Sequence, residues 1–454
     1  MKNREPSMAS KEANFDLHEL FFSITKKDST IVSGNDTFVR ISGYSRDEIL
    51  LQPHNIIRHP DMPKVVFKIL WDHLNANKPV AAYVKNRTKQ GAYYWVFAVV
   101  FPLNDQYISI RIKPSTEVFS IVKELYFRLL MAEVNADMDE SEKLLLELLS
   151  SYGYRDYDHF MNEVLLAELL ERKKLFLENN SDVDSTCLAS EHELKIKALY
   201  CSSKTLLRQY DKWFEKIDLF YRVKSVFEEK ASVLSSLARN IVFLSLNASV
   251  ASYKIDTNGE TFGVLASDIR TNAKENDILI GQIHALSESL SESLNESIFL
   301  VSSISLQMEM VTYFVKELFE NTNGSLNNSV YVLFELVHLY NNKLTELTLI
   351  MDISIQKSLN HLDELEKQIM YLGYIQVYGV IESARSNDAS SGFGEIFSQL
   401  KALILNTTEE ILVMKKMGEE FFRENDILIN ESKEIEIMLN KLEDDMSNMK
   451  NIEG

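Results

Sequence analysis

The chain of 454 residues is poor in proline, glycine and cysteine, and each shortage narrows the folds that it can adopt. All seven prolines lie at or before Pro114. Because proline costs about 3 kcal/mol inside a helix, its absence beyond that point permits very long helices. The few later glycines lie mostly near residues 259–263, at 324 and at 373–394, where a helical chain would turn. We therefore expect a compact head followed by a long helical body.

Other absences bear on location and partners. The two cysteines, Cys187 and Cys201, form no motif, which favours a reducing cytoplasm. No apolar run of about 18 residues is present, so we expect no membrane span. Residues 1–16 are polar and lack the apolar core of a signal peptide. The formal charge of -19 disfavours nucleic acid and anionic membranes as partners. No nicotinamide fingerprint, CxxC pair or acid–base set is present, so we expect no enzyme.

After a polar tail at residues 1–13, the head is expected to occupy residues 14–116. Apolar and β-branched runs at 20–25, 81–88, 93–103 and 107–112 predict strands. Residues 89–91 and 104–106 lie between the last three runs as hairpin turns. A helical stretch from Asn35 to about Ala76 separates the first strand from this meander. The pattern predicts an α+β domain, an antiparallel sheet with flanking helices.

Three segments of the head resemble the PAS domain of bacterial aerotaxis receptors. They are NDTFVRISGYSRDEIL (35–50), QPHNIIRHPDMP (52–63) and YVKNRTKQGAYYWVFAVVFP (83–102). The resemblance implies a PAS sensor that binds FAD non-covalently and responds to oxygen or redox state. This chain departs from the family at residues 78–82, where family members often have a tryptophan.

The resemblance assigns cofactor contacts to six residues, and the need for aromatic walls adds Tyr94 as a seventh candidate. A flavin needs an apolar slot with aromatic walls and a few polar groups for its ring. Arg58 suits a pyrophosphate and Asn86 offers both amide donors and an acceptor. The expected cofactor-binding residues are Arg58, His59, Asp61, Trp71, Asn86, Tyr94 and Trp95.

Each of these residues also has a purely structural interpretation. Trp71, in a helical stretch, is more often a core residue than a cofactor wall. The segment from Arg58 to Asp61 could be a charged cap on a connector. His54 and His59 raise haem as a second cofactor, although a lone histidine is more often structural.

Beyond the head, apolar residues recur at helical spacing. Residues 117–200 predict a connector of several amphipathic helices. Residues 201–320 predict a helical hairpin that turns near Gly259, within the run DTNGE. Residues 325–454 predict a second hairpin that turns near residue 389. Together they favour an all-α body, a four-helix bundle or coiled coil.

The first turn resembles the signalling tip of methyl-accepting chemotaxis receptors. The resemblance rests on LARNIVFLSLNASVASYKIDTNGETFGVLASDIR (237–270). The family's tip glutamate is replaced by Ala251 and its arginine by Lys254. A shift of about 131 residues superposes a second copy, GYIQVYGVIESARSNDASSGFGEIFSQLKAL (373–403), which keeps Glu382 and Arg385.

Two diverged copies in one chain could form the bundle alone, as a pseudo-dimer. The protein would then be a monomer, or a dimer joined through its PAS domain. By resemblance, the partners are a chemotaxis histidine kinase, its coupling protein or other chemoreceptors. The expected partner-binding tip consists of Leu246, Asn247, Lys254, Gly259, Phe262, Arg270, Glu382, Arg385 and Phe393.

These observations predict a cytoplasmic signal transducer in which a redox-sensing or oxygen-sensing PAS head biases a chemoreceptor-like helical body. Its output would be chemotaxis, motility or biofilm signalling. Two alternatives remain open: a cofactor-free scaffold that uses the PAS head for docking, and a haem-based gas sensor.

Overall fold

The computed structural model describes residues 11–134, 137–177, 191–253, 259–320, 328–385 and 392–453. The chain divides into two compact units. The first comprises Met1–Asp211, Phe299–Asn341 and Ile435–Gly454, and the second comprises Lys212–Ile298 and Asn342–Glu434. Three long helices each contribute residues to both units: α9 (Gly259–Glu320), α10 (Asn328–Arg385) and α11 (Phe393–Glu453).

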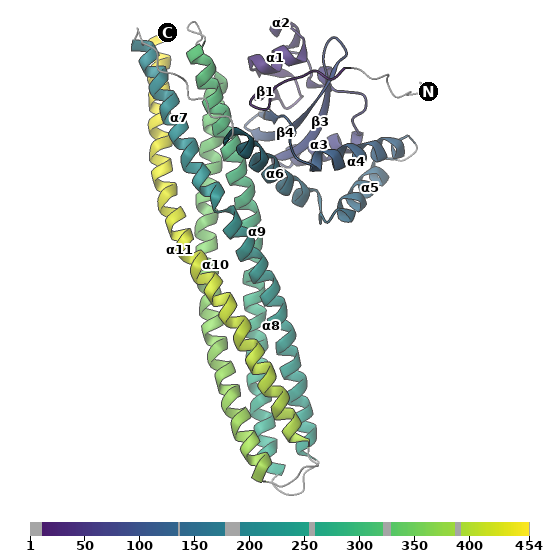
Figure 1. The fold of residues 1–454 in the computed structure, drawn as a ribbon, viewed down its shortest axis with the longest axis vertical. Coiled ribbons are helices and arrows are strands. Elements are labelled where there is room, and N and C mark those ends of the chain that lie inside the picture. Colours follow the sequence, from purple (N-terminus) through teal and green to yellow (C-terminus); the bar gives the residue numbers. More distant parts are fainter. Residues whose placement is uncertain are drawn as a thin grey trace. The chain divides into compact units, whose positions relative to one another are not determined.

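An antiparallel sheet of five strands forms the centre of the N-terminal domain (Figure 1). The strands are β1 (Phe21–Lys26), β2 (Ile31–Gly34), β3 (Val80–Arg87), β4 (Tyr93–Leu103) and β5 (Gln106–Ile112). Their order is β2-β1-β5-β4-β3. The predicted α+β architecture is therefore confirmed. The short strand β2 was not expected from the sequence pattern.

Four short helical elements lie between β2 and β3. They are α1 (Asp36–Ser42), α2 (Arg46–Ile49), the 3-10 helix η1 (His54–Ile57) and α3 (Lys64–Asn75). Asn35 caps α1 by accepting from the backbone N–H of Phe38. The same side chain donates to the carbonyl of Leu20 at 2.8 Å and accepts from the N–H of Phe22 at 3.0 Å. One buried amide therefore fixes α1 to β1.

The register of the sheet decides which side chains share a face. Asn86 on β3 is paired with Tyr94 on β4, and Ser109 on β5 is paired with Ser23 on β1. Successive residues of a strand point to opposite faces. We call the face that carries Asn86 and Ser109 the inner face, and the opposite one the outer face. Arg111, two residues beyond Ser109, also belongs to the inner face.

Connector helices cover the outer face. These are α4 (Val118–Ala132), α5 (Met138–Ser151) and α6 (Tyr157–Leu177), followed by α7 (Glu191–Glu215). The hydroxyl of Tyr126 on α4 donates to the carbonyl of Tyr83 at 2.9 Å. The hydroxyl of Tyr157 on α6 donates to the carbonyl of Ala81 at 3.0 Å. Both bonds satisfy backbone groups of the edge strand β3.

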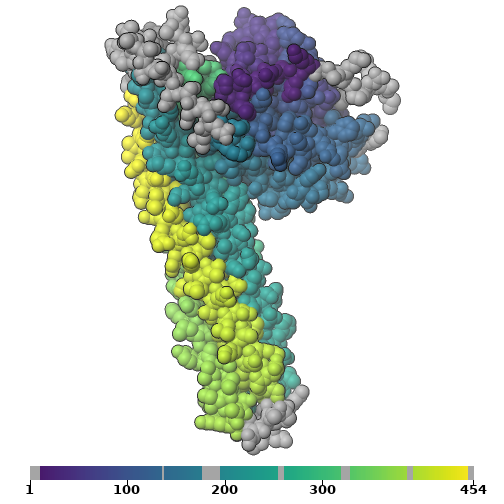
Figure 2. Space-filling model, viewed as in Figure 1, coloured from purple at the N-terminus to yellow at the C-terminus, as the bar shows by residue number. Residues whose placement is uncertain are grey.

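Four long helices make up most of the remaining chain, as the sparse glycines and absent prolines predict. They are α8 (Ile217–Ser252), α9 (Gly259–Glu320), α10 (Asn328–Arg385) and α11 (Phe393–Glu453). In the second unit each helix contacts two others through polar pairs. These pairs are Lys224–Asn295, Asn272–Gln368, Lys415–Glu366 and Arg222–Glu420. The four helices thus pack in a ring, and Figure 2 shows α8 (teal) beside α11 (yellow).

Two stretches of described helix are long and apolar enough to cross a membrane, by length and composition alone. They are Lys195–Ser252 and Glu260–Glu317. The most apolar window is 83% buried inside the protein in the second stretch and 39% buried in the first. A buried core helix passes the same test, so this evidence for a span is weak. The expectation of no membrane span stays a prediction.

Candidate functional site

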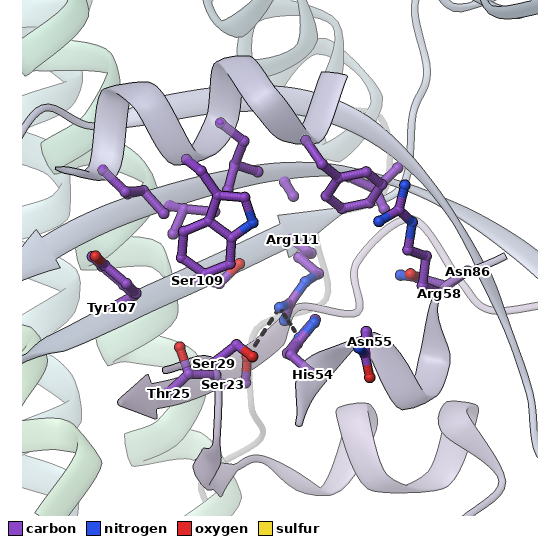
Figure 3. Close-up of a pocket in the computed structure, with 17 residues that line it drawn as sticks. Ser23, Thr25, Ser29, His54, Asn55, Arg58, Asn86, Tyr107, Ser109 and Arg111 are labelled. Carbon is purple, nitrogen blue, oxygen red and sulfur yellow. Dashed lines mark hydrogen bonds between the residues drawn. The ribbon is translucent and has the colours of Figure 1, made fainter. Parts of the chain in front are cut away.

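A cavity of about 270 Å³ lies between the inner face of the sheet and the elements η1 and α3 (Figure 3). Strands β1, β3, β4 and β5 supply one wall, and α3 supplies the other with Phe67, Leu70, Trp71 and Leu74. Its volume is slightly below the roughly 300–1,000 Å³ that ligand pockets occupy. The cavity therefore has room for a ring system.

Arg111 is the central polar group of this cavity. It is 4% exposed, and its Nη2 donates to Ser23 Oγ at 3.0 Å and to His54 Nε2 at 2.7 Å (Figure 3). Burial lowers the pKa of Arg111 to about 10, which leaves it charged at neutral pH. No carboxylate forms an ion pair with it among the described residues. A charge placed in this way suits an electron-rich ligand atom.

His54 is neutral in this arrangement. Burial, followed by the neighbouring Arg111 charge, lowers the pKa of His54 to about 3. Since Nε2 accepts a hydrogen bond from the guanidinium, the imidazole proton must lie on Nδ1. His54 therefore anchors Arg111 without carrying a charge.

Four buried polar atoms at or next to the cavity have no hydrogen-bond partner. They are Asn86 Nδ2, Ser109 Oγ, Arg111 Nη1 and Tyr94 Oη. Asn86, Ser109 and Arg111 all line the cavity. Leaving a buried donor or acceptor unpaired costs about 1–3 kcal/mol. Three such atoms on one cavity wall favour a site built for a polar ligand rather than a packing defect.

Aromatic groups form the side of the cavity that belongs to α3. The ring of Phe67 lies 3.7 Å from the guanidinium carbon of Arg58. Trp71 meets Tyr107 edge-on, with ring centroids 5.8 Å apart. A flat ring bound here would have aromatic walls on one side and the polar groups of β3 and β5 on the other.

The predicted cofactor residues fall into two groups. Arg58, Trp71 and Asn86 line the cavity. Tyr94 shares the inner face with Asn86, but it packs in the adjacent core, stacked on Phe21 with centroids 5.8 Å apart. It belongs to the cavity's support rather than to its lining.

His59 and Asp61 lie outside the cavity lining. The Nδ1 atom of His59 accepts from the backbone N–H of Asp61 at 3.1 Å. The Asp61 carboxylate accepts from Lys85 Nζ at 2.9 Å. Burial, followed by the Lys85 charge, lowers the pKa of His59. This cluster fixes the segment after η1 against β3.

The expectation for Trp95 is wrong as regards its position. Trp95 lies on the outer face, because its neighbour Tyr94 shares the inner face with Asn86. Its ring packs against Phe119 and Tyr126 of α4, at centroid distances of 5.3 and 6.1 Å. Trp95 therefore contributes to the packing of the connector and not to the cavity.

The sequence reasoning missed Arg111 and Ser109 as site residues. A signal was present in the strand YISIRI (107–112), where polar Ser109 and Arg111 alternate with buried isoleucines. A charged residue in a strand buried on both faces needs a partner, and that partner can be a ligand.

The predicted partner-binding tip lies in the second unit, except that Lys254 is outside the described residues. Gly259 is the first residue of α9. Leu246, Asn247, Arg270 and Arg385 are exposed, and Arg385 pairs with Glu382 at 2.8 Å.

Phe262 and Phe393 do not fit a surface role. They are 1% and 0% exposed and stack on each other with centroids 4.3 Å apart. The expectation that these two rings contact a partner directly is therefore wrong. They form part of the core between α9 and α11.

Comparison with known proteins bears on the N-terminal domain. Residues 31–110 match the family described as PAS fold. These residues carry a PAS fold. Over 109 residues the chain is 43% identical to the aerotaxis receptor of Escherichia coli (strain K12). That match covers 23% of this chain and only 22% of the receptor.

Solved structures of LOV domains also match this part of the chain. The dark structure of the blue-light photoreceptor Aureochrome1 LOV is 24% identical and covers 24% of this chain and 86% of its own, with a TM-score of 0.21. The LOV domain from the Erythrobacter litoralis EL346 blue-light activated histidine kinase is 17% identical and covers 21% of this chain and 97% of its own, with a TM-score of 0.20.

Proposed function

We propose that this protein is a signal transducer whose PAS cavity binds a flavin, FAD, and whose helical body passes the resulting signal to chemotaxis proteins. The observation that carries the cofactor proposal is the set of unpaired atoms on Asn86, Ser109 and Arg111, which face one cavity. The identity to the aerotaxis receptor over the same domain supports a sensory role.

The residues present fit the ring of a flavin. Asn86 would donate through Nδ2, Ser109 through its hydroxyl, and Arg111 through Nη1. Phe67 and Trp71 would form an aromatic wall. Arg58, close to Asn86 through a bridge between β3 and the segment after η1, offers a cation for a phosphate.

When bound, a flavin supplies redox chemistry, because its ring changes charge and hydrogen-bonding pattern with oxidation state. Among the chain's own groups, Arg111 would respond to that change. Its guanidinium places a positive charge in the lining of the cavity. Its Nη2 donates to both Ser23 on β1 and His54 on η1. A change in the hydrogen bonding of Nη1 would thus shift the guanidinium and alter its bonds to both β1 and η1.

The haem alternative finds less support in the geometry. A haem ligand needs an imidazole nitrogen free to bind iron. The Nε2 atom of His54 accepts from Arg111 at 2.7 Å, and His59 lies outside the cavity lining. The scaffold alternative gives no reason for three unpaired polar atoms in one cavity.

We also propose the domain organisation expected from the sequence: a PAS sensor at 14–116, a connector at 117–200, and hairpins at 201–320 and 325–454. One contact supports the view that the hairpins are diverged copies. Phe262 and Phe393 are 131 residues apart, the same shift that superposes the two sequences, and they stack on each other. Equivalent residues meet in this way across a two-fold axis.

The cofactor proposal is tested by FAD titration of the purified full chain, followed by absorbance and flavin fluorescence. Trp71→Phe and Asn86→Ala should weaken binding, the latter by at least about tenfold if one hydrogen bond to the ring is lost. Trp95→Phe is the matched control, since that ring lies on the outer face, and it should bind as the unmodified chain does. Equal binding by all three variants would contradict the proposed cavity.

The partner proposal is tested by adding the full chain to a reconstituted array of chemoreceptor, coupling protein and histidine kinase. A change in kinase activity that depends on flavin oxidation state would support it. No binding to any of the three would refute the chemotaxis assignment and leave the cofactor proposal intact.

A further inference from the structure

One carboxylate on the outer face accepts hydrogen bonds from strand β3 and from the segment that follows strand β5. Glu168 of α6 is fully buried. Its Oε1 accepts from the hydroxyl of Tyr83 at 2.6 Å and from that of Thr116 at 2.7 Å. Its Oε2 accepts from the backbone N–H and the hydroxyl of Ser115 at 2.8 and 2.9 Å. A buried carboxylate is stable only with donors of this number and quality.

The donors to Glu168 belong to β3 and to the segment after β5, and β3 and β5 are the strands that carry the unpaired cavity atoms. Tyr83 lies three residues before Asn86 on β3, and Ser115 lies four residues after Arg111, beyond the last residue of β5, Ile112. β4 separates these two strands. Any relative shift of β3 and β5 at the cavity therefore changes the donor geometry at one carboxylate on the opposite face.

One helical turn further along α6, Arg172 makes a second connection. Its side chain is 2% exposed. Its Nε and Nη2 donate to the carboxylate of Glu309 on α9 at 3.0 and 2.7 Å. The guanidinium also donates to the backbone carbonyls of Leu17 and His18, just before β1. Residues four apart on a helix lie on the same side, so α6 presents Glu168 and Arg172 on one face, one turn apart.

The α9 segment that receives this link also touches the sheet directly. Phe314 meets Phe22 of β1 edge-on at 5.1 Å, and the hydroxyl of Tyr313 is 2.9 Å from that of Thr37. A ring contact and a single hydroxyl pair tolerate small slips, whereas a two-pronged guanidinium–carboxylate pair has one favoured geometry. The Arg172–Glu309 pair is therefore the contact best able to carry a direction-dependent displacement.

We propose that Glu168 and Arg172 are positioning residues that couple the PAS cavity to helix α9. They touch no ligand. Glu168 senses the relative position of β3 and β5, and Arg172 transfers a shift of α6 to Glu309. The inference rests on the proposed function only in taking the cavity as the sensory site, and it does not depend on which ligand the cavity binds.

The test measures coupling between cavity and helix without needing the ligand. Asn86→Ala perturbs the cavity in the full chain, and hydrogen exchange of α9 residues 305–317 is followed by mass spectrometry. In the unmodified background, Asn86→Ala should change that exchange rate by at least about fivefold, the lower range for coupled sites. In the Glu168→Gln or Arg172→Lys background, the same change should fall below about twofold.

Glu171→Gln is the matched control. Glu171 is a neighbouring carboxylate on α6 that pairs with Lys174 at 3.7 Å, and its loss should leave the fivefold effect unchanged. If Glu168→Gln does not fold, Tyr83→Phe removes a single donor to Glu168 and should reduce the effect instead.

The outcomes separate the two proposals. A fivefold effect that persists in both relay variants overturns the coupling, as does an Asn86→Ala change that never reaches α9. FAD binding is measured on the same samples. Coupling without FAD binding supports the relay and contradicts the cofactor, and FAD binding without coupling does the reverse.

Discussion

Replacing Gly379 on α10 with alanine should lower the stability of the protein, whereas the same replacement at Gly373, on the same helix, should raise it. A Cβ atom at residue 379 would lie 2.0, 2.2 and 2.5 Å from ring atoms of Phe397. Phe397 is fully buried, so its ring has little room to move aside. A Cβ at Gly373 would have no atom within 4 Å.

The two alanine substitutions should therefore act in opposite directions. Gly373→Ala removes a helix-weakening glycine and should stabilise the protein by about 0.5–1 kcal/mol. Gly379→Ala gains the same stability from the higher helix propensity of alanine. It also overpacks the core, which lowers the stability by about 1–3 kcal/mol, or more for so close an overlap. The net effect at Gly379 should be a loss of stability.

The corresponding residues of the first hairpin suggest a second substitution that should restore part of the lost stability. The residues 131 positions earlier than Gly379 and Phe397 are Ala248 and Ala266, both buried. The double variant Gly379→Ala, Phe397→Ala recreates that pair and should recover part of what Gly379→Ala loses, although Phe397→Ala alone costs about 3–5 kcal/mol.

Thermal unfolding of the full chain, followed by circular dichroism, measures all four variants. A higher melting temperature for Gly379→Ala than for the unmodified chain would refute the packing described here. So would a double variant whose stability is the simple sum of the two single losses, because residues in contact should not behave independently.

Three further predictions concern buried groups of the PAS domain. Because the folded-state pKa of His54 is lowered to about 3, the unfolded chain binds more protons below pH 6.5. Stability should then fall as pH drops, by about 2 kcal/mol at pH 5, and His54→Gln should flatten the pH dependence of urea unfolding. His73 has a pKa raised by its hydrogen bond to Asp158. Its contribution should be present below pH 6.5 and lost as pH rises, so His73→Asn should cost stability at pH 5 more than at pH 8. Tyr94→Phe should leave the melting temperature unchanged or raise it, since the hydroxyl has no partner. Tyr83→Phe should lower it by the equivalent of about 1–3 kcal/mol, since it removes a donor to Glu168. The opposite order for the two tyrosines would contradict the hydrogen bonding described here.

Alternation and turn residues were enough to place four of the five strands and the flanking helices. They did not show whether the even-numbered or the odd-numbered residues of β4 face the cavity. In YYWVF, Tyr94 and Trp95 are equally plausible as inward residues, and only the pairing of Asn86 with Tyr94 decides between them. Register across strands is a long-range property, which a single strand's pattern does not contain.

The tip shows the same limit in the helical body. Resemblance assigns Phe262 and Phe393 to a partner surface, whereas the helical spacing of Phe262 with Leu265, and of Phe393 with Leu400, is typical of core residues. The structure follows the spacing, since both rings are buried against each other. Periodicity reports burial more directly than a motif does, because burial is what sets the periodicity.

The cavity was only partly predictable. Arg58, Trp71 and Asn86 come from the motifs, but the polar centre formed by Arg111, His54 and Ser23 joins three distant segments. Only the folded sheet brings these segments together.

The most direct test of the central claim is the absorbance spectrum of the purified full chain, recorded before and after dithionite. We predict flavin bands that bleach on reduction, return on reoxidation, and are lost in Ser109→Leu, which fills the cavity, but kept in Trp95→Phe. A colourless chain that takes up no added FAD would contradict the claim.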